Sequence, residues 1–210
     1  MQYLKQMKEK KLICFDVDGV LVSSDEVHFL SLKETLEINT GFILEKSTHD
    51  KIASLSTEQK IDWLVSSGLL TPDRVDITKI KKDKFYLIDK YSGHFLYNYE
   101  VANAAISAKE NFNFALVSNA RTEYVKKIAD ELKILGIVYC VGNDLGLKPK
   151  PAPDMYLRAM SYYNTLPSNT MIFEDSDVGL EAAYASRAVV QKVTFSEFNK
   201  DLFVNSVKTL

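Results

Sequence analysis

The sequence predicts an α/β fold, and this prediction depends on two observations. From about residue 100 onward, short apolar runs alternate with segments of helical periodicity, which is typical of βαβ units and a parallel sheet. An earlier apolar run at residues 12–16 is separated from that region by residues 24–97, which show helical periodicity and no convincing strand. We therefore predict a Rossmann-like parallel-sheet core formed by residues 1–23 and 98–210, with an α-helical cap domain, residues 24–97, inserted after the first strand.

The short apolar runs are the expected strands of the core. They lie at residues 12–16, 114–118, 137–141, 170–173 and 188–193. Helices are expected between them: residues 123–135 place apolar side chains on one face, Pro153 suits a first helical turn, and residues 176–186 are rich in alanine. In open parallel sheets, ligands bind beyond the carboxyl ends of the strands, so the chemistry is expected there.

The expected cap contains two recognisable helix starts. Ser56 and Gln59 have the spacing of a capping box, in which the two side chains satisfy each other's free backbone donors. Thr71-Pro72-Asp73 combines an N-cap residue with a proline in the first turn, and it predicts a second helix start.

Composition and charge narrow the class of protein. The chain has 26 Lys and Arg residues against 28 Asp and Glu residues, a formal net charge of -2, which argues against a protein that coats nucleic acid. The apolar run near the N-terminus is short and interrupted by acids, so we expect neither a signal peptide nor a membrane span. Cys14 and Cys140 lie in apolar runs and are expected to be buried thiols. We expect a cytoplasmic monomer.

The first predicted strand ends in an acidic pair. Residues two apart in an extended chain face the same side, so Asp16 and Asp18 can face one site together. One carboxylate can attack phosphorus, while a second carboxyl protonates the leaving group and then activates water. Gly19 lets the chain turn out of the sheet. A calcium-binding loop is the alternative, but it needs glycine at its sixth position, which does not match this spacing.

Two further segments offer groups suited to phosphate. Ser118 places a hydroxyl at the end of the second core strand and Asn119 follows it, although a helix cap would use the same residue types. Lys150 lies between Pro149 and Pro151, whose rings stiffen the backbone that presents the ammonium. A fixed ammonium can neutralise both a phosphoryl group and a nucleophilic carboxylate. By itself, the segment would instead be interpreted as an exposed loop with a solvated lysine.

The run at residues 170–173 is followed by Glu174 and Asp175. Two acids at the end of a buried strand are costly unless a positive group compensates them. A magnesium ion, which prefers hard oxygen ligands, is the natural candidate, and helix capping by acids is the alternative.

Together, and in this order along the chain, the four motifs resemble the haloacid dehalogenase-like (HAD) hydrolase superfamily over nearly the whole sequence. The resemblance is strongest to the group of phosphoglycolate phosphatases and β-phosphoglucomutases, whose helical cap follows the first strand. It implies that Asp16 is the nucleophile and a magnesium ligand. It also implies that Asp18 is the general acid and base and binds magnesium through its backbone carbonyl.

The resemblance assigns the remaining motifs as well. It implies that Ser118 holds a phosphoryl oxygen with Asn119 close to it, and that Lys150, rather than Lys148, is the catalytic lysine. Asp175 would be a second carboxylate on Mg²⁺. Glu174 would bind the ion directly or through water.

The resemblance extends into the cap entry. His28 either contacts the substrate there or is an ordinary residue of a cap helix. The stretch from Ser56 to Lys60 lacks the arginine that mutase-like members carry, which weakens a mutase interpretation because a mutase must hold a second phosphate. Lys60 either contacts an anionic substrate or is a solvated surface lysine.

The resemblance thus implies a Mg²⁺-dependent phosphohydrolase that removes phosphate from a small phosphorylated metabolite through an aspartyl-phosphate. A phosphomutase of the β-phosphoglucomutase type is the enzymatic alternative, whereas dehalogenase chemistry needs neither Asp18 nor the metal site. A non-catalytic binding protein on the same fold is a third possibility, although the charged groups of a working site are all present. A phosphoacceptor signalling domain is disfavoured by the large insertion after the first strand.

Overall fold

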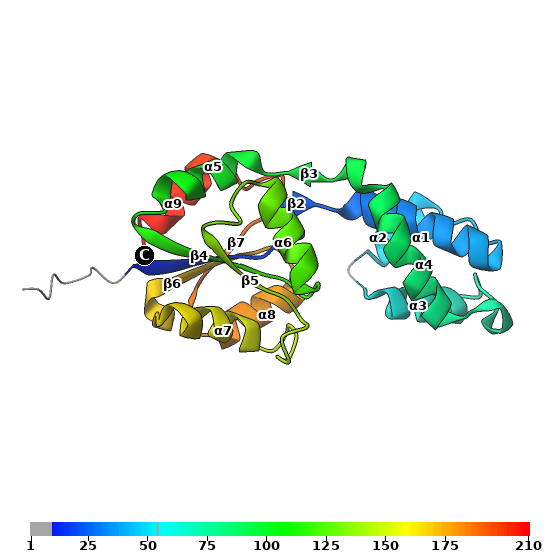
Figure 1. Ribbon diagram of the computed structural model, residues 1–210. Helices are drawn as coiled ribbons and strands as arrows, with labels where there is room; N and C mark the ends of the chain where they lie inside the picture. Colours follow the sequence, from blue (N-terminus) through cyan, green and yellow to red (C-terminus); the bar gives the residue numbers. More distant parts are fainter. Residues whose placement is uncertain (1–9, 54) are drawn as a thin grey trace, which may run out of the picture. The chain divides into compact units, whose positions relative to one another are not determined.

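The computed structural model describes residues 10–53 and 55–210. The chain divides into two compact units. The core unit consists of the chain up to Ser23 together with Tyr97–Leu210, and the inserted unit is Ser24–Leu96 (Figure 1). The core unit contains the large sheet, and the inserted unit is helical.

The large sheet is parallel throughout, with the strand order β5-β4-β1-β6-β7. Its strands are β1 (Lys11–Phe15), β4 (Phe112–Val117), β5 (Val138–Val141), β6 (Thr170–Glu174) and β7 (Val189–Lys192). The five predicted apolar runs are confirmed as these strands. In the central strand, Phe15 lies opposite Leu116 of β4 and Phe173 of β6. The three central strands therefore end together, and the residues that follow them meet at one edge of the sheet.

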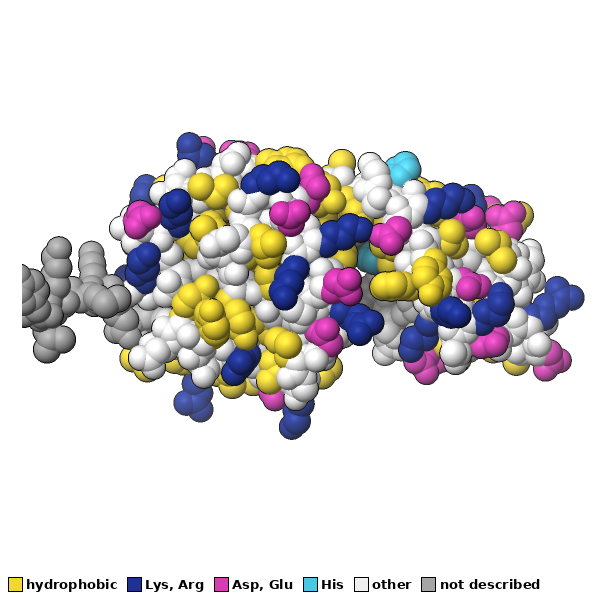
Figure 2. All heavy atoms as spheres, in the orientation of Figure 1, with side chains coloured by type: hydrophobic (Ala, Val, Ile, Leu, Met, Phe, Trp, Pro, Cys, Tyr) yellow, Lys and Arg dark blue, Asp and Glu magenta, His cyan; other side chains and the backbone are white. Residues whose placement is uncertain are grey.

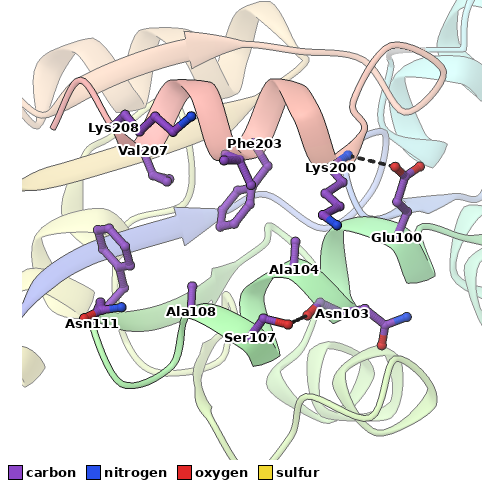
Figure 3. A pocket seen from close by; sticks show the side chains of 12 residues that line it. Glu100, Asn103, Ala104, Ser107, Ala108, Asn111, Lys200, Phe203, Val207 and Lys208 are labelled. Carbon is purple, nitrogen blue, oxygen red and sulfur yellow. Dashed lines mark hydrogen bonds between the residues drawn. The ribbon is translucent and has the colours of Figure 1, made fainter.

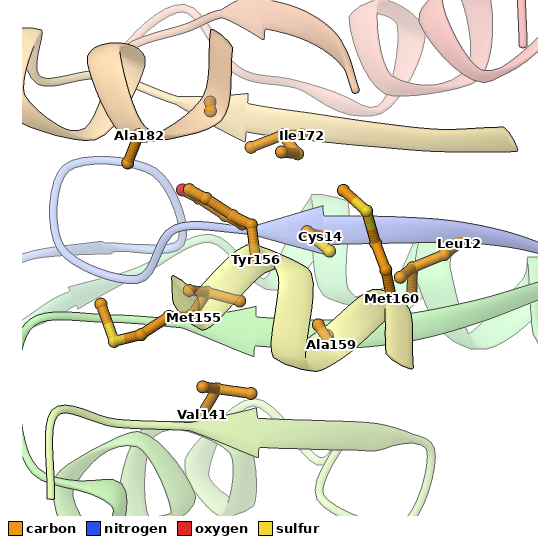
Figure 4. Close-up of a cluster of buried hydrophobic side chains, with 12 residues drawn as sticks. Leu12, Cys14, Val141, Met155, Tyr156, Ala159, Met160, Ile172 and Ala182 are labelled. Carbon is orange, nitrogen blue, oxygen red and sulfur yellow. The ribbon is translucent and has the colours of Figure 1, made fainter. Parts of the chain in front are cut away.

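Helices cover both faces of this sheet (Figure 1). One face carries α5 (Tyr99–Ala108), α6 (Thr122–Glu131) and α9 (Lys200–Val207), and the other carries α7 (Asp154–Tyr163) and α8 (Asp177–Ala185). Leu12 and Cys14 point into a buried cluster with Met155 and Tyr156 of α7 (Figure 4). Phe15, which directly follows Cys14 in β1, instead belongs to an aromatic layer on the opposite face, because successive strand residues point in opposite directions.

The inserted unit is built from four helices around an apolar cluster. They are α1 (Asp25–Thr40), α2 (Lys46–Lys51), α3 (Thr57–Ser66) and α4 (Ile77–Lys90). The capping box is confirmed, since Ser56 accepts from the Gln59 backbone and Gln59 accepts from the Ser56 backbone. The second predicted start is wrong. Thr71 precedes only a single 3-10 turn, and α4 begins later, where the side chain of Asp76 caps it.

Two short strands lie at the ends of the insertion. They are β2 (Val22–Ser23) and β3 (Leu96–Tyr97), which pair as a two-stranded sheet. The remaining elements are single 3-10 turns, η1 (Pro72–Arg74), η2 (Ser92–His94) and η3 (Pro167–Asn169). Across residues 10–53 and 55–210, no helix has the length and apolar character required to span a membrane.

Candidate active site

The site lies at the carboxyl edge of the three central strands. Asp16 directly follows β1, and its backbone N–H donates to the carbonyl of Phe173 (2.9 Å). Ser118 directly follows β4, and its backbone N–H donates to the carbonyl of Val141 (3.0 Å). Glu174 is the last residue of β6. The sheet hydrogen bonds therefore fix the backbone of each of these residues, and all three side chains are buried.

Lys150 is the positive centre of the site. Its ammonium donates to Asp16 Oδ1, to Glu174 Oε2 (2.7 Å) and to the carbonyl of Val117 (3.0 Å). It also lies 5.0 Å from the ring centre of Tyr156. The side chain is buried, so it is not a solvated loop lysine. One ammonium thus connects groups from the ends of β1, β4 and β6.

Asn119 holds the segment that carries this lysine. Its Nδ2 donates to the backbone carbonyl of Lys150 (3.2 Å), and its Oδ1 accepts from the backbone N–H of Lys150 (2.9 Å). The amide that we expected to bind substrate is therefore engaged with the protein backbone on both sides. The hydroxyl of the neighbouring Ser118 accepts from the backbone N–H of Ala120 (3.0 Å).

Glu174 accepts from five donors. Its Oε1 accepts from the backbone N–H of Asp175 (3.2 Å) and from the backbone N–H and hydroxyl of Ser176 (3.3 and 3.1 Å). Its Oε2 accepts from Lys150 and from the hydroxyl of Tyr156 (2.6 Å). Charge-assisted hydrogen bonds of this kind hold a carboxylate firmly in its ionised form.

Two glycines make room for the acids. A Cβ at Gly179 would lie 2.0 Å from the carboxyl carbon of Glu174. A Cβ at Gly19 would lie 2.0 Å from Asp175 Oδ2, and Gly19 also has a φ of +85°. Any side chain at either position would displace an acid of the site.

Burial and charge shift the pKa values of the acids in different directions. Burial raises the pKa of Asp16 well above its usual value, against the opposing effect of Lys150. Burial by itself would raise the pKa of Glu174, but the charge of Lys150, together with hydrogen bonds from Lys150, Tyr156 and Ser176, outweighs burial and lowers it. Burial and the neighbouring Glu174 raise the pKa of Asp175 to about 7. Lys150 therefore neutralises the charge of Glu174 most effectively. The ionised forms of Asp16 and Asp175 would be stabilised by a further cation.

The acids have the geometry of a cation site. Asp16, Glu174 and Asp175 each offer a carboxylate oxygen, and these oxygens lie within 4.8 Å of one another. A donor set made only of carboxylate oxygens suits a hard cation such as Mg²⁺. The residues present therefore fit the predicted magnesium ion.

Asp18 lies in the turn after β1 and receives a hydrogen bond that sequence reasoning missed. The hydroxyl of Tyr124, on α6, donates to Asp18 Oδ1 (2.7 Å). Tyr124 and Tyr156 are the two site residues absent from our sequence-based predictions. Both belong to helices that the sequence predicted, but helical periodicity does not show which group a tyrosine hydroxyl contacts.

The other two predicted contact residues belong to the inserted unit. His28 lies on α1 and is partly buried, and its Nδ1 has no hydrogen-bond partner. Lys60 lies on α3 and is only 5% exposed, so it is not a solvated surface lysine. Burial lowers the pKa of Lys60.

A groove lies elsewhere on the core unit, between α5 and α9 (Figure 3). Among the residues that line it, Glu100 is the one acid, and its carboxylate accepts from the backbone N–H of Lys200 (3.2 Å). The groove reaches Asn111 and Phe112 at the amino end of β4. It is therefore at the opposite end of that strand from Ser118, and it lacks paired acids.

Comparison with known proteins identifies the family. The family model of haloacid dehalogenase-like hydrolases matches residues 10–186. The chain belongs to the haloacid dehalogenase-like hydrolases. The four strand-end motifs of this HAD-like hydrolase all lie within the matched residues.

Two relatives and one fold neighbour illustrate the group. The chain is 29% identical over 185 residues to "Phosphoglycolate phosphatase" of Aquifex aeolicus (strain VF5), covering 82% of this chain and 79% of the relative. It is 26% identical over 180 residues to "Beta-phosphoglucomutase" of Bacillus subtilis (strain 168), covering 82% and 78%. CbbY from Rhodobacter sphaeroides has been solved with phosphate and, as a mutant, with xylulose-(1,5)bisphosphate. Both CbbY structures share the fold, with a TM-score of 0.73, identities of 20% and 18%, and coverage of 88% of this chain and 86% of the other.

Proposed function

We propose that this HAD-like hydrolase is a Mg²⁺-dependent phosphatase that removes phosphate from a small phosphorylated metabolite through an aspartyl-phosphate on Asp16. The observation that carries the proposal is the buried cluster in which Lys150 bonds to both Asp16 and Glu174 at the ends of the central strands. Relatives named as a phosphatase and a phosphomutase support a phosphorylated substrate. So do the CbbY structures with phosphate and a sugar bisphosphate.

In the first step, a carboxylate oxygen of Asp16 attacks the phosphorus of the monoester, and the bond from phosphorus to the leaving oxygen breaks. Asp18 gives its proton to that oxygen, so the product leaves as an alcohol. The hydrogen bond from Tyr124 orients the Asp18 carboxyl for this transfer. The Lys150 ammonium neutralises charge on the phosphoryl oxygens.

In the second step, Asp18 takes a proton from water, and the water oxygen attacks the phosphorus of the aspartyl-phosphate. The bond from phosphorus to the Asp16 oxygen breaks, which releases inorganic phosphate and restores the carboxylate. The hydroxyl of Ser118 holds a phosphoryl oxygen in both steps.

Asp16, Asp175 and Glu174 would hold the magnesium ion, with the backbone carbonyl of Asp18 as a further ligand. When bound, Mg²⁺ supplies positive charge that stabilises the transferring phosphoryl group. The proposed reaction needs no nucleic acid, membrane or second subunit, and a cytoplasmic monomer stays our prediction.

The test is release of inorganic phosphate from a panel of phosphorylated metabolites. We expect release that requires Mg²⁺, that stops with a chelator, and that is lost in Asp16→Asn. Asp177→Asn is the matched control, because this nearby acid has a side chain that is 97% exposed. Isomerised phosphate ester without free phosphate would instead favour the phosphomutase alternative. No reaction with any compound would favour the non-catalytic binding protein.

A further inference from the structure

Lys150 differs from the acids of the site in how its backbone is held. Asp16 and Glu174 are fixed by the hydrogen bonds of the sheet, because they lie at the ends of β1 and β6. Lys150 lies well beyond the end of β5, and residues 142–153, which include it, contain no helix or strand. Something other than the sheet must therefore fix the position from which this side chain reaches the site.

The side chain of Asn119 supplies this support. Its Oδ1 accepts from the backbone N–H of Lys150 (2.9 Å), and its Nδ2 donates to the backbone carbonyl of Lys150 (3.2 Å). Pro149 and Pro151 have no backbone N–H, so Lys150 carries the one backbone donor of these three residues. A primary amide offers an acceptor and donors side by side, which matches the N–H and the carbonyl of a single residue.

Asn119 is itself held at the end of β4. Its backbone carbonyl accepts from Nδ2 of Asn143. The backbone N–H of the preceding residue, Ser118, donates to the carbonyl of Val141 at the end of the neighbouring strand (3.0 Å). The amide of Asn119 therefore connects the Lys150 backbone to a fixed point of the sheet.

Helix capping does not explain this asparagine. The N-cap residue of α6 is Arg121, and its side chain makes no capping hydrogen bond. The backbone N–H of Thr122, the first residue of that helix, donates instead to Asp144 Oδ1 (2.9 Å). The capping role that the sequence left open for Asn119 is thus wrong, and the described contacts of its amide are those with Lys150.

The end of β4 holds Lys150 at both ends of its side chain. The carbonyl of Val117 accepts from the ammonium (3.0 Å), while Asn119 holds the backbone. The remaining ammonium contacts are with Asp16 and Glu174. In the proposed reaction, phosphorylation of Asp16 changes the first of these contacts, but it leaves the amide of Asn119 untouched. A long, flexible side chain depends on such a constant anchor.

We propose that Asn119 is a positioning residue, which acts through the Lys150 backbone to set where the ammonium lies relative to Asp16 and the transferring phosphoryl group. Asn119 would then affect the substrate only through Lys150, and not by the direct contact that we expected. The effect on reaction rate rests on the proposed function. The effect on Lys150 itself does not, so the two effects are tested separately.

The first experiment measures the rates at which acetic anhydride modifies individual lysines, followed by mass spectrometry. Exposed Lys148 is the internal reference. Lys150 is buried and should react much more slowly. We expect Asn119→Ala to raise the Lys150 rate, relative to that of Lys148, by about tenfold, because two hydrogen bonds are lost. Asn103→Ala, at an exposed asparagine of α5, is the matched control and should leave the ratio unchanged.

An isosteric variant supports this measurement. Asn119→Asp keeps an acceptor for the Lys150 N–H but loses the donor to the Lys150 carbonyl. It should also raise the reactivity of Lys150, and it replaces Asn119→Ala if that protein is poorly folded. Reactivity of Lys150 equal to that in the unmodified protein, in the folded variants, would overturn the proposal.

The second experiment measures kcat and KM for phosphate release from the most active compound of the panel. Misplacing the ammonium should lower kcat by about tenfold or more in both variants, whereas Asn103→Ala should keep the unmodified kcat. A raised KM with unchanged kcat would show direct substrate binding by Asn119 and would overturn the proposal. Absence of any Asp16-dependent release in the unmodified protein would instead contradict the proposed function, while the acetylation rates would still decide whether Asn119 holds Lys150.

Discussion

At the scale of single residues, the candidate site depends on groups that hold its buried acids in place. Glu174 accepts five hydrogen bonds, and one of them comes from the buried hydroxyl of Tyr156. Residues that position metal ligands in this way commonly change metal affinity when they are removed.

Tyr156→Phe should therefore weaken magnesium binding while it preserves the ring beneath Lys150. We expect the Mg²⁺ concentration for half-maximal phosphate release to rise by about tenfold. Tyr162→Phe, at a residue that is 57% exposed, is the control. An unchanged magnesium dependence in Tyr156→Phe would show that the hydroxyl does not position Glu174.

Gly179→Ala tests the close approach of α8 to the same carboxylate. The added Cβ would meet the Glu174 carboxyl carbon at 2.0 Å, so either the helix or the acid must shift. We expect a loss of about 1–3 kcal/mol in the free energy of unfolding, measured with urea, together with lower activity. Gly136→Ala, where a Cβ has open space, should change neither quantity by a similar amount. Equal effects of the two substitutions would contradict this account.

The sequence could predict that Asp16, Glu174 and Asp175 come together, because parallel strands bring their carboxyl ends to one edge. Lys150 lies well beyond the end of β5, and it was assigned to the site only by the family resemblance. It could not predict the hydroxyl of Tyr156. That side chain reaches Glu174 only through the packing of α7 on the sheet. The burial of Lys60 could not be predicted from the sequence either, since a lysine on a short helix is most often solvated.

At the scale of helices and strands, local hydrogen bonds explain which boundaries could be predicted. The Ser56–Gln59 capping box is closed by side chains three positions apart in the chain, so its sequence signal is sufficient. Pro72 suits a 3-10 turn as well as an α-helix, and the chain stays extended at Val75 before Asp76 caps α4. Strands of two residues, such as β2, are too short for any periodicity to reveal.

The histidines of α1 and α2 predict a pH dependence of stability. Burial, followed by nearby lysines, lowers the pKa of His28 to about 3 and that of His49 to about 4. Between these values and about 6.5, the unfolded chain binds more protons than the folded chain, so stability falls as the pH falls. Each histidine contributes on the order of 1 kcal/mol per pH unit in this window.

Urea unfolding at about pH 7 and about pH 5 measures this dependence. His49→Gln should reduce the loss of stability between the two pH values. His94→Gln should leave it unchanged, because His94 is exposed. A loss in His49→Gln as large as in the unmodified protein would contradict the prediction.

Lys84 of α4 should make the free protein less stable. Burial, with a smaller effect of Lys60, lowers the pKa of Lys84 to about 8, so near neutral pH the folded state holds a poorly solvated charge. We expect Lys84→Met to raise the free energy of unfolding by about 1–3 kcal/mol in the absence of anions. A less stable Lys84→Met protein would indicate that the ammonium is part of the packing.

At the scale of the whole molecule, the net charge is small. The formal net charge is -2, and basic and acidic side chains are interspersed on the surface that Figure 2 shows. The face shown carries no broad patch of one charge, so under the proposed function we expect attraction of the phosphate to depend on local groups such as Lys150. The alternation of apolar runs and helical segments, with a helical insertion after the first run, was enough to predict the fold. The identity of the substrate was not predictable, because no motif of the sequence specifies which side chains of the inserted unit, Ser24–Leu96, are buried together.

Binding of beryllium fluoride, a mimic of a phosphorylated aspartate, tests the central claim most directly. Fluorine NMR detects the protein-bound species, which should form only with Mg²⁺ present and should be absent in Asp16→Asn. Asp177→Asn, a change at an exposed acid, should bind it as the unmodified protein does. A missing signal in the unmodified protein, or an equal signal in Asp16→Asn, would contradict the assignment of Asp16 as the nucleophile.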